Sequence, residues 1–221
     1  MKLRITLICI AIFAAISNAA YAARGSDGNV SIIYWQAPSI LNPYLSSGTK
    51  DIESASLVIE PLGRYDETGK LVPFLAEEIP TVANGGVSAD LTSITWKVKK
   101  GIVWSDGTPV TSADVKFSAD YCMHPDGGCS QLAKFDGIKS ISTPDDRTVV
   151  VTFNGPMPNP YGPFMGGQTP IIQKAQFENC MGAKAQQCTE QNFNPIGTGP
   201  FVVTDFRPND VIQYKANENY R

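Results

Sequence analysis

Four of the five cysteines are the clearest group of residues that could do chemistry, because they form two close pairs; the fifth, Cys9, lies in the apolar run near the N-terminus. Cys122 and Cys129 enclose the polar segment MHPDGG, and Cys180 and Cys188 enclose MGAKAQQ. Four cysteines allow three disulfide connectivities, and the shortest loops cost the least entropy to close. We therefore predict the disulfides Cys122–Cys129 and Cys180–Cys188.

The alternative use of these cysteines, as metal ligands, has little support. Zinc sites usually combine closely spaced cysteine and histidine ligands. No C-x-x-C pair is present, and His124 is the only histidine in the sequence. We predict neither a metal site nor a cofactor.

Residues for hydrolytic chemistry are also sparse. Such chemistry needs a nucleophile beside a base, or two carboxylates that face each other in a pocket. The sequence has no G-x-S-x-G motif, and the adjacent carboxylates Glu77-Glu78 and Asp145-Asp146 fall at a predicted helix end and in a predicted turn. A secreted hydrolase is therefore a minor alternative, and we expect that the protein is not an enzyme.

The segment WSDGTPVTSADV indicates how local elements are joined. Trp104 ends a predicted strand in which apolar and charged side chains alternate. Asp106 and Gly107 favour a turn, so we interpret Asp106 as a turn residue and not as a catalytic acid. Thr111, with Asp114 three residues later, predicts a capping box and a helix over 112–122.

The remaining elements are short and of mixed type. They are a buried strand over 30–35, a helix capped by Thr49 or Asp51 and ended by Pro61, a hairpin around DETG followed by a short helical turn, two strands around Pro-Asp-Asp, a short helix in QKAQFENCMG, and a hairpin about 208–210. Residues 154–170 are too rich in proline and glycine for regular structure. The fold class is mixed α and β with mostly antiparallel strands.

The N-terminus predicts export. Lys2 and Arg4 precede an apolar run, and Ala20-Tyr21-Ala22 fits a cleavage site, so residues 1–22 are predicted to be a signal peptide and the product to be periplasmic. Cleavage would remove two cations and lower the net charge from −3 to −5. Without a basic run, nucleic acid is not an expected partner.

Five stretches in this order resemble the extracytoplasmic solute-binding proteins of ABC importers, in particular the peptide and nickel type called family 5. They are LNPYL, VIEPL, LVPFLAEE, TWKVKKGIVWSDGTPVTSADVKFS and PIGTGPFVV. The resemblance implies a periplasmic receptor, expected to be a monomer, that closes two lobes on a solute and delivers it to a membrane permease. Peptides are the expected solute; an oligosaccharide, an opine-like compound or a nickel complex are the alternatives, and the single histidine makes nickel the weakest.

The resemblance also implies where a ligand would bind. In peptide-binding members the loop and helix start after the L-x-P motif lie beside an extended ligand, and small residues there leave the main chain available for hydrogen bonds. The alternative is that these residues only cap the helix. Aromatic residues nearby could line the cleft or belong to the core. The candidate residues are Ser47, Gly48, Thr49, Tyr34, Trp35, Tyr44, Gly166, Gly167 and Gln168.

Length is where the sequence departs from this family, whose members are typically more than twice as long. We expect residues 23–221 to form an N-terminal lobe without the second lobe and the returning C-terminal segment, as in a truncated product or a fragment.

Overall fold

The computed structural model describes residues 28–221 and divides the chain into two units, one ending at Trp35 and one spanning residues 36–221. The predicted signal peptide lies outside the described residues. In the first unit, residues 28–35 form no helix or strand, so the strand predicted over 30–35 is wrong. Its β-branched residues favour an extended chain, but a strand is stabilised by hydrogen bonds to a neighbouring strand. Residues 30–35 belong to none of the described sheets.

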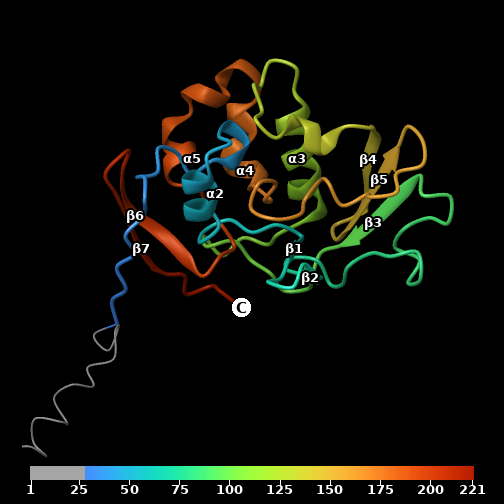
Figure 1. Cartoon of the computed structure of the whole chain (residues 1–221), viewed down its shortest axis with the longest axis horizontal. Coiled ribbons are helices and arrows are strands. Elements are labelled where there is room, and N and C mark those ends of the chain that lie inside the picture. Colours follow the sequence, from blue (N-terminus) through green and yellow to red (C-terminus); the bar gives the residue numbers. More distant parts are fainter. Residues whose placement is uncertain (1–27) are drawn as a thin grey trace, which may run out of the picture. The chain divides into compact units, whose positions relative to one another are not determined.

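The second unit contains three small antiparallel sheets (Figure 1). Strands β1 (Gly63–Tyr65) and β2 (Leu71–Pro73) form one hairpin, and β6 (Phe201–Arg207) and β7 (Val211–Ala216) form another. The third sheet has the order β3-β5-β4, with β3 at Ser93–Lys97, β4 at Ile138–Asp145 and β5 at Thr148–Phe153. The predicted hairpins and the predicted antiparallel class are confirmed.

Short helices lie between the β6–β7 hairpin and the three-stranded sheet (Figure 1). The α-helices are α2 (Thr49–Ala55), α3 (Ser112–Met123), α4 (Lys174–Phe177) and α5 (Thr189–Phe193). The 3-10 helices are η1 (Pro43–Leu45), η2 (Leu132–Phe135), η3 (Glu178–Cys180) and η4 (Gly182–Gln187). Residues 154–170 form no helix or strand, as predicted.

The turn and helix start around Trp104 are as predicted. The Trp104 side chain is buried. Asp106 accepts hydrogen bonds from the backbone N–H and the hydroxyl of Thr108, at 2.9 and 2.6 Å, which makes it a turn residue. Asp114 accepts from the backbone N–H and the hydroxyl of Thr111, at 2.9 and 3.0 Å, and so fixes the start of α3.

Part of the core lies between α3 and the three-stranded sheet. Alternate residues of β3 and β5 point into it, because successive side chains of a strand face opposite sides. Ile94 and Trp96 on β3 pair with Val151 and Val149 on β5, and all four are buried. The alternation predicted for the first of these strands is confirmed over Ser93–Lys97, but the strand ends there and not at Trp104.

Two predictions about helices are wrong. Residues 74–79 form no helical turn, because their backbone pairs with neighbouring chain: the Phe74 N–H donates to the Leu62 carbonyl and the Glu77 N–H to the Lys97 carbonyl, each at 2.8 Å. Helix α2 starts after Gly48 without a side-chain cap and ends at Ala55, well before Pro61.

The motif PIGTGPF owes its glycines to a close backbone contact. A Cβ atom at Gly197 would lie only 1.8 Å from the carbonyl oxygen of Val58. The N–H of Gly199 donates to the same carbonyl at 2.7 Å. Only glycine lets the two chain segments approach this closely.

Candidate functional site

The loop before α2 presents small, accessible residues. Ser47 and Thr49 are exposed and Gly48 is half-buried. Helix η1 and a hydrogen bond of 3.0 Å from the Gly48 N–H to the Ser46 hydroxyl fix the path of the loop. The conformation of the loop is thereby fixed, while the side chains of Ser47 and Thr49 stay exposed.

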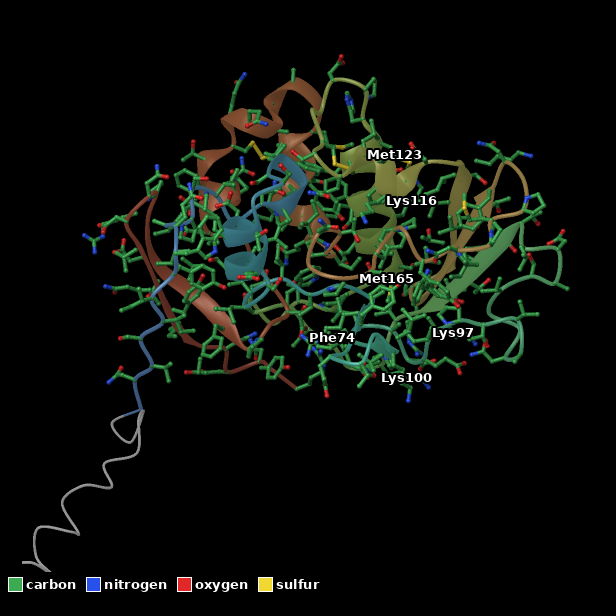
Figure 2. All side chains as sticks on the ribbon, viewed as in Figure 1. Phe74, Lys97, Lys100, Lys116, Met123 and Met165 are labelled. Atoms are coloured by element: carbon green, nitrogen blue, oxygen red, sulfur yellow. A yellow bond between two sulfur atoms is a disulfide. The ribbon has the colours of Figure 1, made fainter. Side chains whose placement is uncertain are left out.

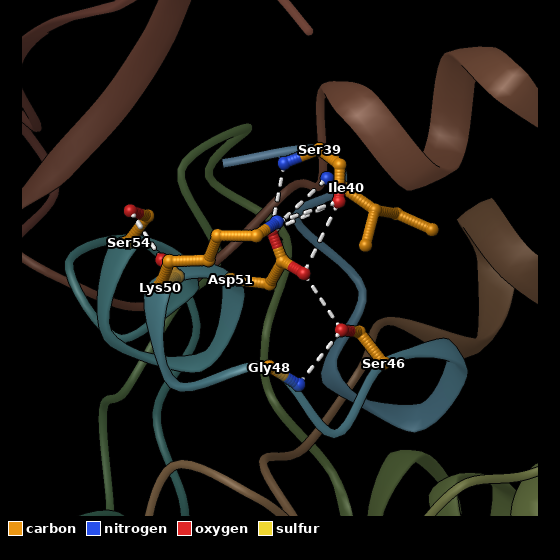
Figure 3. Close-up of polar contacts among 7 residues, drawn as sticks. All are labelled: Ser39, Ile40, Ser46, Gly48, Lys50, Asp51 and Ser54. Atoms are coloured by element: carbon orange, nitrogen blue, oxygen red, sulfur yellow. Dashed lines mark hydrogen bonds and ion pairs between the residues drawn. The ribbon is translucent and has the colours of Figure 1, made fainter. Parts of the chain in front are cut away.

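The buried carboxylate of Asp51 is at the centre of the hydrogen bonds beneath this loop (Figure 3). One oxygen of Asp51 accepts hydrogen bonds from the backbone N–H of Ser39 at 2.7 Å and from the Lys50 ammonium at 2.8 Å. The other oxygen accepts from the Ser46 hydroxyl at 2.7 Å. The Asp51 side chain is 3% exposed and the Lys50 side chain is 11% exposed, so this is a nearly buried ion pair.

The hydrogen bonds keep Asp51 ionised. Burial alone would raise the pKa of its carboxyl, but the donors from Lys50, Ser46 and Ser39 outweigh burial and hold the pKa below its ordinary value. Gly48 fits against this group, because a Cβ there would lie 3.0 Å from an Asp51 oxygen. A larger residue at this position would press against the carboxylate, so the small size of Gly48 fits the network around Asp51.

The second predicted loop, at Gly166, Gly167 and Gln168, borders the same helix. A Cβ at Gly167 would lie 2.4 Å from the hydroxyl oxygen of Ser56 and 3.1 Å from Ile52, so the loop passes directly over the last turn of α2. Gln168 is exposed. The structure thus brings both predicted loops to α2, one at each end of a seven-residue helix.

Tyr44 joins the two loops from within the core. Its side chain is fully buried, and its hydroxyl donates to the Pro170 carbonyl at 2.6 Å. Burial raises the pKa of this hydroxyl well above its ordinary value. In this structure Tyr44 lines the core and not a surface. Tyr34 and Trp35, the other aromatic candidates, belong to the first unit, where both are exposed.

Several supporting residues were missed from the sequence. The sequence offers Thr49 or Asp51 as the helix cap, but neither caps α2, and the Asp51 carboxylate instead accepts hydrogen bonds from residues on the preceding loop. Lys50 and Ser39 had no predicted role. Neither had Gln131, which donates to the Ser46 carbonyl, nor Asn192, whose carbonyl accepts from the Leu41 N–H. The adjacent Lys-Asp pair at a helix start gave a local signal, but the burial of both side chains depends on segments distant in the chain.

Both predicted disulfides are present. Cys122–Cys129 links the end of α3 to the following loop, with a Cα–Cα distance of 5.1 Å. Cys180–Cys188 closes the segment around η4, with a Cα–Cα distance of 5.9 Å. Figure 2 shows the first bond beside Met123.

The carboxylates considered for catalysis have structural partners. Asp145 accepts from the backbone N–H groups of Arg147 and Thr148, each at 2.8 Å, and so forms a turn. Glu77 forms an ion pair with Arg147. Across residues 28–221 we find neither a group of three or more His, Cys, Asp or Glu residues able to hold a metal nor a helix suited to spanning a membrane.

Comparison with known proteins shows which protein family this chain is similar to. Residues 70–221 match the family model for bacterial extracellular solute-binding proteins, family 5 Middle. Protein XP55 of Streptomyces lividans is 28% identical over 199 residues, which are 89% of this chain and 34% of that relative. The chain thus spans about a third of the length of the curated relatives it matches.

Solved structures agree on the fold. The oligopeptide-binding protein AppA of Bacillus subtilis, in complex with a nonapeptide, superposes with a TM-score of 0.73 at 24% identity, covering 85% of this chain and 36% of that one. AgaA of A. tumefaciens, in complex with agropinic acid, superposes with a TM-score of 0.70 at 28% identity, covering 84% and 35%.

These matches show the class of protein: the second unit is a partial lobe of an extracytoplasmic solute-binding protein. Because the family model covers more than half of the chain, the chain belongs to the bacterial extracellular solute-binding proteins, family 5. The predicted family and fold class are confirmed, and the relatives are solute-binding proteins.

Proposed function

We propose that this chain forms one side of the ligand site in the substrate-binding component of an ABC importer, and that the ligand is a short peptide. The observation that carries the proposal is the loop at Ser47–Thr49, whose exposed residues rest on a buried, fully hydrogen-bonded network. A fixed loop can hydrogen-bond the main chain of an extended peptide without losing much conformational entropy on binding.

The proposed ligand surface comprises Ser47, Gly48 and Thr49 with Gly166, Gly167 and Gln168, because both loops border α2. Tyr34 and Trp35 remain proposed contributors. We leave Tyr44 out, since its buried hydroxyl already donates to Pro170. The partner that would receive the ligand is a membrane permease, and the receptor would act as a periplasmic monomer after removal of residues 1–22.

Family membership and the oligopeptide-binding relative from Bacillus subtilis support a peptide ligand. A second candidate is an opine-like solute, which the likeness to the agropinic acid complex supports. A peptide and an opine-like solute would need different hydrogen-bonding partners from the loop. A peptide offers repeated main-chain donors and acceptors, whereas an opine offers a few carboxylates and hydroxyls.

Isothermal titration can decide between them. The protein is isolated from the periplasm, freed of bound ligand by reversible unfolding, and titrated with a mixture of di- to pentapeptides, with agropinic acid and with an oligosaccharide mixture. We expect heat only with peptides. Gly48→Ala, whose Cβ would lie 3.0 Å from an Asp51 oxygen and disturb the loop, should weaken peptide binding, and Lys215→Ala, on the exposed side of β7, should not. Heat with agropinic acid alone would favour the second candidate, and no heat with any ligand would reject both.

A further inference from the structure

Two buried amide side chains, each close to a disulfide, hold the loop that leads to Ser47. Gln131 follows Cys129 by two residues and is 5% exposed. Its Nε2 group donates to the carbonyls of Pro43 and Ser46, at 3.2 and 3.0 Å. The carbonyl of Ser46 belongs to the peptide group that it shares with Ser47, so Gln131 sets the orientation of that group.

Asn192 holds the beginning of the same loop. It lies four residues after Cys188 and is 2% exposed. Its backbone carbonyl accepts from the Leu41 N–H at 2.9 Å, and its side-chain oxygen accepts from the Asn42 amide at 2.8 Å. Its own amide nitrogen donates to the Ala185 carbonyl at 2.8 Å, inside the loop that Cys180–Cys188 closes.

The disulfides restrict both amides. The N–H of Gln131 lies 3.4 Å from the Sγ of Cys129, and the N–H of Asn192 donates to the Cys188 carbonyl at 3.0 Å. The two disulfide loops also touch, because a Cβ at Gly182 would lie 2.7 Å from the His124 ring. The two disulfide loops are therefore in contact with each other, and together they pack against the loop at 41–46.

We propose that Gln131 and Asn192 are positioning residues that fix the loop before α2 for ligand binding, and that the two disulfides hold them in place. Asn192 fixes the start of the loop at 41–42, and Gln131 fixes its main chain from Pro43 to the peptide group of Ser46 and Ser47. The inference rests on the proposed function for the identity of the ligand. The energetic reason is that ordering a flexible loop costs conformational entropy, and a loop that is already ordered avoids that cost on binding.

Hydrogen exchange on the full 221-residue chain tests this without a ligand. Gln131→Met keeps a similar side-chain length and removes both donors, and Gln213→Met, on the exposed face of β7, is the matched control. We expect backbone amides at 41–49 to exchange at least tenfold faster in Gln131→Met. Exchange in β3 and β5 should stay within twofold of the unmodified chain.

Two outcomes would overturn the proposal: unchanged exchange at 41–49, or equal acceleration in β3 and β5, which would mean a general loss of stability. If Gln131→Met does not fold, the side-chain amide protons of Gln131 decide the matter in the unmodified chain. They should exchange at least tenfold more slowly than those of the exposed Gln213, and equal rates would reject the bonds.

Peptide titration of the same variants separates this inference from the proposed function. Faster exchange at 41–49 together with at least tenfold weaker peptide binding supports both. Faster exchange in a protein that binds no peptide before substitution rejects the peptide ligand and leaves the positioning role of Gln131 standing.

Discussion

Replacing Asp51 by asparagine is the most informative perturbation of the support under the loop. Asparagine has nearly the same shape but no charge, so the Lys50 ammonium would lose its counter-charge and keep only neutral acceptors, among them the Ser39 hydroxyl at 2.8 Å. Removing one partner of a buried ion pair costs about 3–5 kcal/mol. Because Ser39 remains, we expect the lower end, about 3 kcal/mol of unfolding free energy.

A matched control is available on the surface of α3. Lys116 and Asp120 form an ion pair four residues apart, and both side chains are 39% exposed. Such exposed helix pairs contribute about 0.3–0.5 kcal/mol, so Asp120→Asn should change the unfolding free energy by no more than that. Urea unfolding with intact disulfides, followed by the fluorescence of the buried Trp96 and Trp104, measures both variants.

The double variant Lys50→Met/Asp51→Asn tests the cause of the loss. If the loss comes from an uncompensated buried ammonium, removing that ammonium should recover at least about 1 kcal/mol relative to Asp51→Asn alone. The reasoning would be refuted if Asp51→Asn cost no more than Asp120→Asn, or if the double variant were less stable than the single one.

Lowering the pH should reduce the difference in unfolding free energy between the unmodified chain and Asp51→Asn. The pKa of Asp51 lies below its ordinary value in the folded state, so the unfolded chain takes up a proton first as the pH falls. The stabilisation is complete above about pH 4, the ordinary range of an aspartate, and is lost as the pH falls through the lowered pKa.

Two further predictions concern packing and alkaline pH. Gly197→Ala should lower the free energy of unfolding by more than about 3 kcal/mol or prevent folding, since its Cβ would overlap the Val58 carbonyl. Gly155→Ala, which would place a Cβ with nothing within 4 Å, should change it by no more than about 0.5 kcal/mol in the same urea assay, and equal losses in the two variants would contradict the argument that Gly197 must be glycine. Burial raises the pKa of Tyr121 to about 12 and that of Tyr44 further, so their stabilisation is present below the ordinary tyrosine pKa near 10 and is lost progressively above it. Absorbance at alkaline pH should show these two tyrosines ionising only on unfolding, and their ionisation in the folded protein at pH 10 would contradict this.

Local signals were sufficient for the elements that depend on neighbouring residues. The capping box at Thr111 and Asp114, the turn at Asp106, and the short disulfide loops each involve residues close in sequence, and all were predicted correctly. The resemblance to family 5 supplied the family and pointed to the loop after LNPYL, which no periodicity alone would have singled out.

Distant contacts account for what the sequence did not indicate. Gln131 reaches the Ser46 carbonyl across 85 residues, and Asn42 reaches Asn192 across 150. Asp51 looked like a helix cap because the loop that brings Ser39 to its carboxylate is not visible in a local window. The strand predicted over 30–35 failed for a related reason, because strand propensity does not supply a partner strand.

Native mass spectrometry of the protein isolated from the periplasm tests the central claim most directly. Gentle ionisation preserves noncovalent ligands, and fragmentation of the released species identifies them. The account predicts bound species that are short peptides, with less of them retained by a Gly48→Ala variant, whose Cβ would press against Asp51. Bound sugars or opine-like compounds in their place, or peptides retained equally by the variant, would contradict the account.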